Sequence, residues 1–281
     1  MPARKSAYDR KIAQQIRAVN RLDREITRRI QKAAKEARAK IHDKLRELAS
    51  ARAKRLTPNQ VSYLRTEAAR ELGAFRAKAM NILSQGIEQS QELGALAGEA
   101  ALEQIGISGA VIPAASPQIT ALAMEYGADL ITKITEETRR AINAELMRAI
   151  LGELTPYDAM RTVDKAMGVG LKHGITMKAE RIVRTELTRA YSMAQAASLN
   201  SIAGQLPDET RPKLMKTWIS AKHPGRTRPA HWEADGQTVP YDKPFIVGGE
   251  ELDFPGDPKG SAANTINCLC RMVINTEKLV G

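Results

Sequence analysis

The 281-residue chain is 43% hydrophobic but only 4% aromatic, and this Ala-, Leu- and Ile-rich composition favours helices over a β-sandwich or β-barrel. It contains no run of eighteen apolar residues and begins without the apolar core of a secretory signal, so neither a transmembrane helix nor a signal peptide is predicted. The formal net charge of +11 points to an anionic partner, nucleic acid being the usual one.

The first predicted helix runs from Ile12 to about Leu48. Its apolar residues recur mostly every three or four positions and form a narrow stripe on an otherwise charged helix. This pattern is typical of a helix that packs through one face, against a partner helix or a neighbouring subunit. Residues 1–60 hold eighteen Lys and Arg against six Asp and Glu, a balance of +12, so the remainder is nearly neutral. This basic region is either a nucleic-acid-binding arm or a solvated helix face.

Two more long helices are predicted before residue 155. The sequence Thr-Pro-Asn-Gln at residues 57–60 is a capping signal that opens the second helix, which continues to about Ile105 with irregularities at Gly86 and Gly94. A loop over residues 106–117 leads into the third helix. The residues expected on its inward face are Leu122, Tyr126, Leu130, Ile134, Ile142, Leu146 and Ile150. Long helices with short connections predict an elongated, basic helical region over residues 1–154.

The sequence pattern of residues 155–281 predicts a compact α+β module. Thr155 and Asp158 form a second capping signal, for a short helix to about Met167, and a longer helix follows over residues 177–203. After Gly204, short segments rich in β-branched and aromatic residues alternate with Gly- and Pro-rich turns. The strands predicted from them are residues 213–221, 238–239, 245–247 and 270–274. The predicted fold class is therefore α+β: a long N-terminal α-helical region followed by a compact C-terminal α+β module with short strands.

Cys268 and Cys270 are the two cysteines of the chain and lie too close in sequence for a disulfide framework, which indicates synthesis in a reducing cytoplasm. In an extended segment, residues two apart point to the same face, about 6–7 Å apart. Two thiolates so placed could bind one Zn²⁺ ion, with imidazoles from His231 and His223 completing a tetrahedral ligand set. The alternative is a pair of reduced core cysteines, because free cysteine is commonly buried.

An enzymatic hypothesis uses the same segment. In a metal-dependent nuclease, His231 would be the general base, Glu233 or Asp235 would bind the metal, and Glu186 would be a further acidic residue. The sequence fixes no geometry of nucleophile, base and orienting group for such a site. Residues 184–186 (Arg-Thr-Glu) are more simply explained as side chains that lock their helix to the strands. We therefore expect a structural role, not an enzyme.

Several motifs follow one another in order between residues 155 and 275. They are Arg184-Thr185-Glu186, Trp218, Arg226-Thr-Arg228 with His231, Asp235-Gly236, Phe245, Pro255-Gly256-Asp257-Pro258, and Asn267-Cys268 with Cys270. In their order and spacing they resemble the phage Mu protein F-like family, the head-morphogenesis or minor capsid proteins of tailed bacteriophages. Two positions depart from the family's pattern: His223 stands where an acidic residue is more frequent, and Leu269 stands where an arginine is usual.

The resemblance implies a minor virion protein that associates with the portal protein, and with capsid or scaffold proteins, during head assembly in the host cytoplasm. It implies a location inside the head at the portal vertex, where the basic N-terminal helices would contact packaged DNA. A partner such as the portal protein would cover the apolar stripe of the first helix. His231, Cys268 and Cys270 match the family and are expected to form a shared structural, metal-binding cluster. The alternative is a metal-dependent nuclease or an ADP-ribosyltransferase-like effector delivered with the virion.

Overall fold

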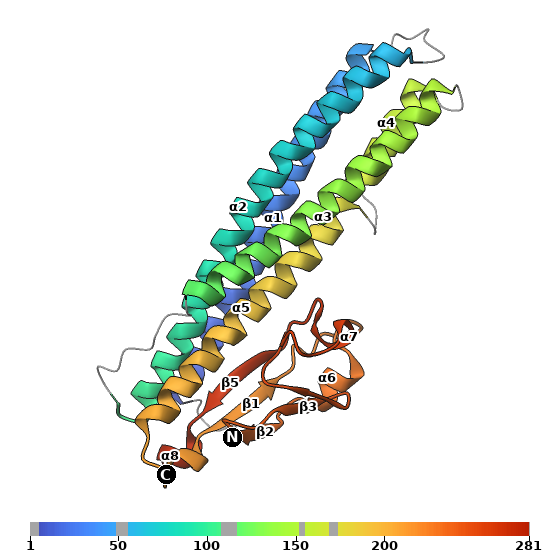
Figure 1. Cartoon of the computed structure of the whole chain (residues 1–281). Helices are drawn as coiled ribbons and strands as arrows, with labels where there is room; N and C mark the ends of the chain where they lie inside the picture. Colours follow the sequence, from blue (N-terminus) through green and yellow to red (C-terminus); the bar gives the residue numbers. More distant parts are fainter. Residues whose placement is uncertain (1–5, 49–55, 108–116, 152–154, 169–173, 281) are drawn as a thin grey trace. The chain divides into compact units, whose positions relative to one another are not determined.

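The computed structural model describes residues 6–48, 56–107, 117–151, 155–168 and 174–280 (Figure 1). Long helices form the first part of the chain, and short antiparallel strands form a small C-terminal sheet module, so the predicted α+β class is confirmed. The long helices are α1 (Ala7–Leu48), α2 (Pro58–Gln104), α3 (Pro117–Ile150), α4 (Pro156–Met167) and α5 (Ile175–Gln205). None of the helices in these described ranges is long and apolar enough to cross a membrane.

The C-terminal module contains a three-stranded sheet and a two-stranded hairpin. In the sheet, β1 (Met215–Ile219) lies between β2 (Thr238–Pro240) and β5 (Arg271–Asn275) and is antiparallel to both. The hairpin pairs β3 (Phe245–Val247) with β4 (Glu250–Leu252). The remaining elements are the 3₁₀ turn η1 (Arg211–Lys213) and the short helices α6 (Pro229–Glu233), α7 (Ala262–Thr265) and α8 (Glu277–Val280). Strands β1, β2, β3 and β5 lie at the predicted positions. The other elements have three to five residues, too few to show a periodic pattern.

Two compact units divide the chain, and they do not follow the predicted division into residues 1–154 and 155–281. Unit 1 comprises residues 1–24, 85–124 and 183–281, and unit 2 comprises residues 25–84 and 125–182. Helices α1, α2, α3 and α5 each contribute residues to both units. The predicted boundary marks a change in sequence pattern, whereas the compact units are defined by contacts between segments that are distant in sequence.

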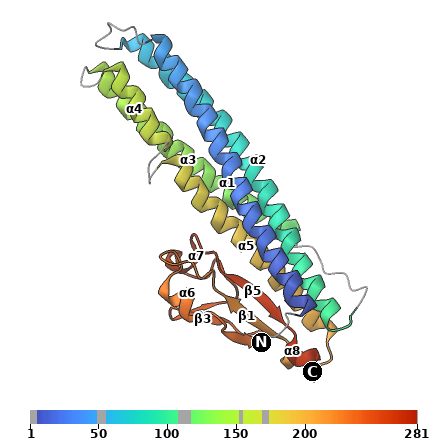
Figure 2. The ribbon, with the colours of Figure 1, turned by 180° about the vertical axis from the view of Figure 1, so that it is seen from behind.

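Unit 2 is a helical bundle, in which α1 and α2 run side by side in both views (Figure 2). Ion pairs join its helices: Glu36 of α1 with Lys78 of α2 at 2.7 Å, and Glu137 of α3 with Lys178 of α5 at 2.6 Å. Most of the apolar stripe on α1 is buried within the chain. Its buried members are Ile12, Val19, Ile26, Ile30, Ala33, Ala37, Ile41 and Leu45. The expectation that an external partner covers this stripe is therefore wrong.

The inward face predicted for α3 is correct only in its second half. Ile134, Ile142 and Leu146 are buried, but Leu122 is 65% exposed and Tyr126 is 51% exposed. Residues four apart are rotated by about 40° on a helix of 3.6 residues per turn, so a stripe made only of four-residue steps drifts away from the buried face. Helix α2 also continues without interruption through both predicted irregularities. Most of the predicted loop before α3, residues 108–116, lies outside the described residues.

Both predicted capping signals are confirmed. Thr57 N–H donates to Gln60 Oε1 at 2.8 Å, and Gln60 N–H donates to Thr57 Oγ1 at 3.3 Å. At α4, Thr155 and Asp158 form the same reciprocal pair, with a proline at the first helical position. In each case the cap satisfies backbone N–H groups that have no partner within the helix, which fixes where the helix begins.

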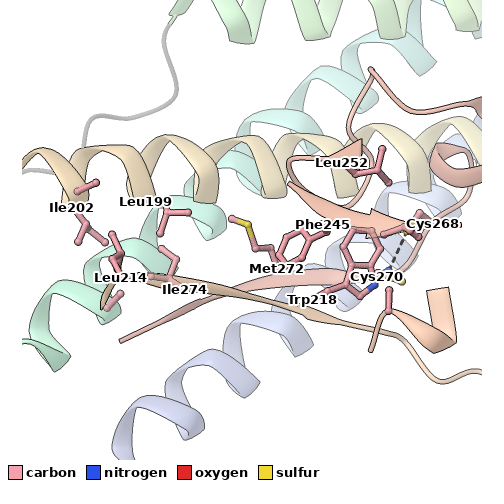
Figure 3. Packing of buried hydrophobic residues seen from close by; sticks show 14 of the residues in the cluster. Leu199, Ile202, Leu214, Trp218, Phe245, Leu252, Cys268, Cys270, Met272 and Ile274 are labelled. Carbon is pink, nitrogen blue, oxygen red and sulfur yellow. Dashed lines mark hydrogen bonds between the residues drawn. The ribbon is translucent and has the colours of Figure 1, made fainter. Parts of the chain in front are cut away.

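The core of unit 1 lies between α5, the sheet and the β3–β4 hairpin (Figure 3). Trp218 of β1 is fully buried, and its ring forms T-shaped contacts with Phe245 (5.5 Å between ring centroids) and His231 (5.7 Å). The other large members of this core are Leu102, Leu199, Ile202, Leu214, Val247, Leu252, Met272 and Ile274. Cys268 and Cys270 belong to the same cluster, so the candidate metal ligands lie at an edge of a well-packed apolar core.

Two glycines of α2 provide a matched test of this packing. A Cβ atom at Gly94 would lie 2.4 Å from the backbone oxygen of Tyr191 and 2.7 Å from the Cβ of Ala194, whereas Gly73 has no atom within 4 Å of that position. We expect Gly94→Ala to destabilise the protein by about 1–3 kcal/mol through overpacking. Gly73→Ala should stabilise it by about 0.5–1 kcal/mol. Chemical denaturation measures both values, and equal effects would contradict the close approach of α2 and α5 at Gly94.

Candidate metal centre

Two short segments of unit 1 carry the candidate ligands. Helix α6 begins after Arg228 with Pro229 in its first position, where a backbone N–H is not needed, and it carries His231. Cys268 and Cys270 lie in the segment that leads into β5. All three candidate side chains are 2% exposed, so the surrounding core excludes most solvent from them.

The three ligand atoms have the spacing of a metal site. His231 Nδ1 lies 3.4 Å from Cys270 Sγ and 3.6 Å from Cys268 Sγ, and all three atoms lie within 4.8 Å of one another. Ligand atoms around tetrahedral zinc, with bonds of about 2.1 Å to nitrogen and 2.3 Å to sulfur, are separated by about 3.6–3.8 Å. The cluster could therefore hold a metal ion with only small shifts. Among the described residues, no other group of three His, Cys, Asp or Glu side chains comes together in this way.

The two thiols have opposite pKa shifts. A hydrogen bond with Cys268 and, to a lesser degree, the His231 imidazole lower the pKa of Cys270 to about 5. The same interaction with Cys270, together with burial, raises the pKa of Cys268 well above its ordinary value. The backbone N–H of Cys270 also donates to Cys268 Sγ at 3.4 Å (Figure 3). At neutral pH one proton is thus shared by two sulfurs, and a bound metal ion would displace it.

The second nitrogen of His231 is buried without a hydrogen-bond partner among the described residues. Its Nδ1 faces the sulfurs, and the ring packs against Trp218. A metal-bound histidine usually donates its other N–H to an oxygen atom, which fixes the ring's orientation. Here the close packing against the indole fixes it instead.

His223 is not part of the cluster, although the sequence analysis included it as a fourth ligand. The structure places it on an exposed turn, where its backbone carbonyl accepts hydrogen bonds from the N–H groups of Arg226 and Thr227. Gly225, with φ of +71°, completes this turn. The chain reverses before it reaches α6, and so the turn holds His223 apart from His231.

A cavity of about 30 Å³ adjoins the three candidate ligands. A water molecule needs about 10–15 Å³ of such space, so a solvent molecule fits as the fourth ligand. Arg184, Arg226 and Arg228 line this cavity, and no Asp or Glu does so among the described residues. A metal ion here would have two thiolates, one imidazole and one solvent position, with no carboxylate beside it to act as a base.

Helix α5 holds the cysteine segment through hydrogen bonds from three of its residues. Arg184 Nη1 donates to Asn267 Oδ1 at 2.8 Å, and Thr185 Oγ1 accepts from Asn267 N–H at 2.8 Å. One turn further on, Thr188 Oγ1 donates to the Cys268 carbonyl at 3.0 Å. Asn267 itself has φ of +59°, in the left-handed region that asparagine tolerates better than most residues. The interpretation of residues 184–186 as a lock between helix and strands is confirmed for Arg184 and Thr185.

The carboxylates of the nuclease hypothesis lie outside the metal-ligand group. Glu186 is buried and accepts hydrogen bonds from Arg189 at 2.8 and 2.9 Å, and burial raises its pKa despite this partner. Asp235 Oδ1 accepts from the Ser220 backbone N–H at 2.8 Å, and Glu233 is exposed. None of the three joins the metal-ligand group.

Two residues near the cluster were missed by the sequence analysis. Arg271 directly follows Cys270, is 3% exposed, and donates to Thr188 Oγ1 at 3.0 Å and to the Cys270 carbonyl at 2.9 Å. A charged residue at the start of an otherwise apolar strand was a signal that could have identified it. Thr188 had no such signal, because a threonine inside a helix commonly bonds only to its own helix.

Comparison of the chain with protein-family models, curated proteins and solved structures gave no match. The geometry of the site and the order of the sequence motifs are therefore the observations that bear on function.

Metal analysis of variants tests the ligand set. We expect purified protein to hold about one zinc ion per chain, and His231→Ala, Cys268→Ser and Cys270→Ser each to lose most of it, because each removes one of three ligands. His223→Ala is the matched control and should retain the metal. Elemental analysis after dialysis gives the stoichiometry. Metal-free wild-type protein that takes up no zinc on titration would favour reduced core cysteines instead.

The protonation of the cysteine pair predicts how zinc binding depends on pH. At pH 7, binding should release about one proton, from Cys268, because Cys270 is already a thiolate above its pKa of about 5. As the pH falls towards 5, Cys270 also becomes protonated, so the affinity should fall and the number of released protons should rise. Isothermal titration calorimetry in buffers of different ionisation enthalpy measures both. An affinity that does not change between pH 5 and 7 would contradict this protonation pattern.

Proposed function

We propose that the chain is a minor capsid or head-morphogenesis protein of a tailed bacteriophage, in which a structural Zn²⁺ ion fixes the C-terminal module. The observation that carries the proposal is that motifs distant in sequence contact one another. Arg184 and Thr185 bind Asn267, next to the cysteine pair, while His231 faces both sulfurs. These motif residues are the ones on which the resemblance to the phage Mu protein F-like family rests.

One other motif of the resemblance, residues 255–258, also has structural contacts. Asp257 accepts hydrogen bonds from the backbone N–H groups of Asp253, at 2.8 Å, and Lys259, at 2.9 Å, and so closes its own turn. Gly256, with φ of +85°, offers its carbonyl to Arg189 of α5 at 3.1 Å. The motif residues thus hold loops onto α5, which supports an architectural role for the module.

The absence of a carboxylate from the cavity beside the candidate ligands, among the described residues, supports a structural role for the ion over a hydrolytic one. Three protein ligands with one solvent position is a ligand count also found in catalytic zinc sites, but hydrolytic sites commonly place a general base beside the bound water as well. In the nuclease alternative, His231 would also have to act as a base while its Nδ1 faces the two sulfurs.

Contact with packaged DNA is proposed for the basic face of α1. Exposed cationic residues recur along this helix at steps of three or four, which places them along one side. They are Arg17, Arg21, Arg24, Arg28, Lys32 and Lys35. Phosphate contacts of this kind carry no sequence information and weaken as salt rises.

The proposed partners and location come from the resemblance: the portal protein, capsid or scaffold proteins, assembly in the host cytoplasm, and a final position inside the head at the portal vertex. The test is mass spectrometry of procapsids and virions from a host that expresses the whole gene cluster. We expect the chain in both particles at low copy number, together with portal protein in pull-downs. Particles that assemble normally and contain no copy of the chain would contradict the proposal.

DNA binding is tested by replacing charges on α1 without removing the helix, because its buried stripe is part of the core. Arg21, Arg28, Lys32 and Lys35 are replaced by glutamine in one variant. Each lost phosphate contact should lower the slope of log affinity against log salt by about 0.9. The control variant replaces four exposed cationic residues of α2 and α3. They are Arg65, Arg76, Lys133 and Arg140.

Filter binding to duplex DNA over a salt series measures the two slopes. The control variant should keep the wild-type slope and affinity, whereas equal losses in both variants would indicate only a general charge effect. The same samples, incubated with DNA with and without a chelator, test the nuclease alternative. Chelator-sensitive cleavage that is lost in His231→Ala would favour the enzyme.

A further inference from the structure

Unit 1 contains a second, larger cavity that the proposed function does not use. Its volume is about 410 Å³, within the range of about 300–1,000 Å³ typical of small-molecule sites. Arg24 of α1, Arg184 of α5, Arg226 of the turn before α6 and Arg271 of β5 all line it. One carboxylate, that of Asp23, is also in the lining, so four guanidinium groups face a single acidic group.

Arg271 is the most buried of these arginines and forms no ion pair with a described carboxylate. It is 3% exposed, and its guanidinium donates to three neutral oxygens: Thr188 Oγ1, the Cys270 carbonyl, and Asn20 Oδ1 at 3.2 Å. No described Asp or Glu lies within ion-pair distance of it, and its Nε has no hydrogen-bond partner among the described residues. Buried charges in proteins are normally paired, because desolvation of an isolated charge costs several kcal/mol. Asp23 in the same lining lies against Arg184, so an anion in the adjoining cavity would give Arg271 the direct ion-pair contact that it lacks.

Two of the other arginines are available to a ligand. The exposed side chains of Arg24 and Arg226 form no ion pair or hydrogen bond with a described residue. Arg184 is oriented by its bond to Asn267 and lies 3.5 Å from Asp23. The planar guanidinium group presents paired N–H donors that match the oxygens of a phosphate group.

Part of the lining is apolar. Ile16, Ile219 and Leu269 are half-buried and contribute to the wall of the cavity. A small inorganic anion would leave these side chains uncovered. A ligand with both a phosphate group and an organic part would contact both kinds of surface.

From this combination we infer that the cavity binds a phosphate group carried by a nucleotide-sized ligand, with the phosphate against the arginines and the organic part against the apolar wall. This inference does not rest on the proposed phage function, nor on a metal ion at the neighbouring cluster. The same chemistry can come from free phosphate, from a phosphate monoester or from a phosphodiester, and the test separates these sources.

The test is calorimetric titration of the full chain with four probes: inorganic phosphate, adenosine 5′-monophosphate, a dinucleoside monophosphate and adenosine. We expect saturable binding of at least one phosphate probe, with adenosine much weaker. The stronger of the two nucleotide probes distinguishes a phosphate monoester from a phosphodiester, and inorganic phosphate binding as tightly as either would contradict a contribution of the apolar wall. Adenosine binding as tightly as its monophosphate, or no saturable binding of any phosphate probe, would overturn the inference.

Variants locate the site. The double variant Arg24→Gln and Arg226→Gln removes two exposed guanidinium groups without disturbing an observed contact, so it should fold and lose at least about tenfold in affinity. Arg17→Gln is the matched control, because Arg17 is exposed on the same helix and does not line the cavity. It should bind the phosphate probes as wild type does. A double variant that binds with unchanged affinity would show that the anion binds elsewhere.

Discussion

The C-terminal module depends on the hydrogen bonds that tie α5 to the segment before β5. Arg184 and Thr185 hold Asn267 in its left-handed conformation, and Thr188 holds the carbonyl of Cys268. These contacts set the direction in which the chain enters β5 and turn both sulfurs towards His231. The helix therefore shapes the candidate metal centre without contributing a ligand.

The segment before β5 brings several ionisable groups together in a buried environment. A buried guanidinium, a shared thiol proton and an unpaired imidazole nitrogen lie close together in an apolar core. A Zn²⁺ ion with two thiolates would be neutral overall and would remove the shared proton. It would not form an ion pair with Arg271, for which the partner we propose is an anion in the larger cavity. Of the two proposed ligands, the zinc ion would thus balance the thiolates and the anion would balance Arg271.

Much of the fold could be predicted from the sequence, because its signals are local. Capping residues at Thr57 and Thr155 fixed two helix starts, and β-branched runs located four strands. The approach of His231 to both cysteines was predicted, from residue type together with the family resemblance. The exclusion of His223 was not, because it depends on a turn whose direction no periodicity encodes. Arg271 and Thr188 were not predicted, because the hydrogen bond between them joins β5 to α5 and no local sequence pattern indicates it. The compact units likewise reflect contacts across more than a hundred residues.

One hydrogen bond joins two residues that lie near opposite ends of the sequence. Tyr8 of α1 donates its hydroxyl proton to the Ile274 carbonyl of β5 at 2.5 Å, across 266 positions. Unit 1 is thus assembled from three widely separated stretches, whereas all of unit 2 lies between residues 25 and 182. Contacts of such sequence separation form slowly, because a long loop must close first. During synthesis the helical bundle of unit 2 can therefore fold before β5, the last strand of the sheet module, has been made. A ribosome stalled before β5 would leave the apolar core of unit 1 incomplete and exposed to chaperones.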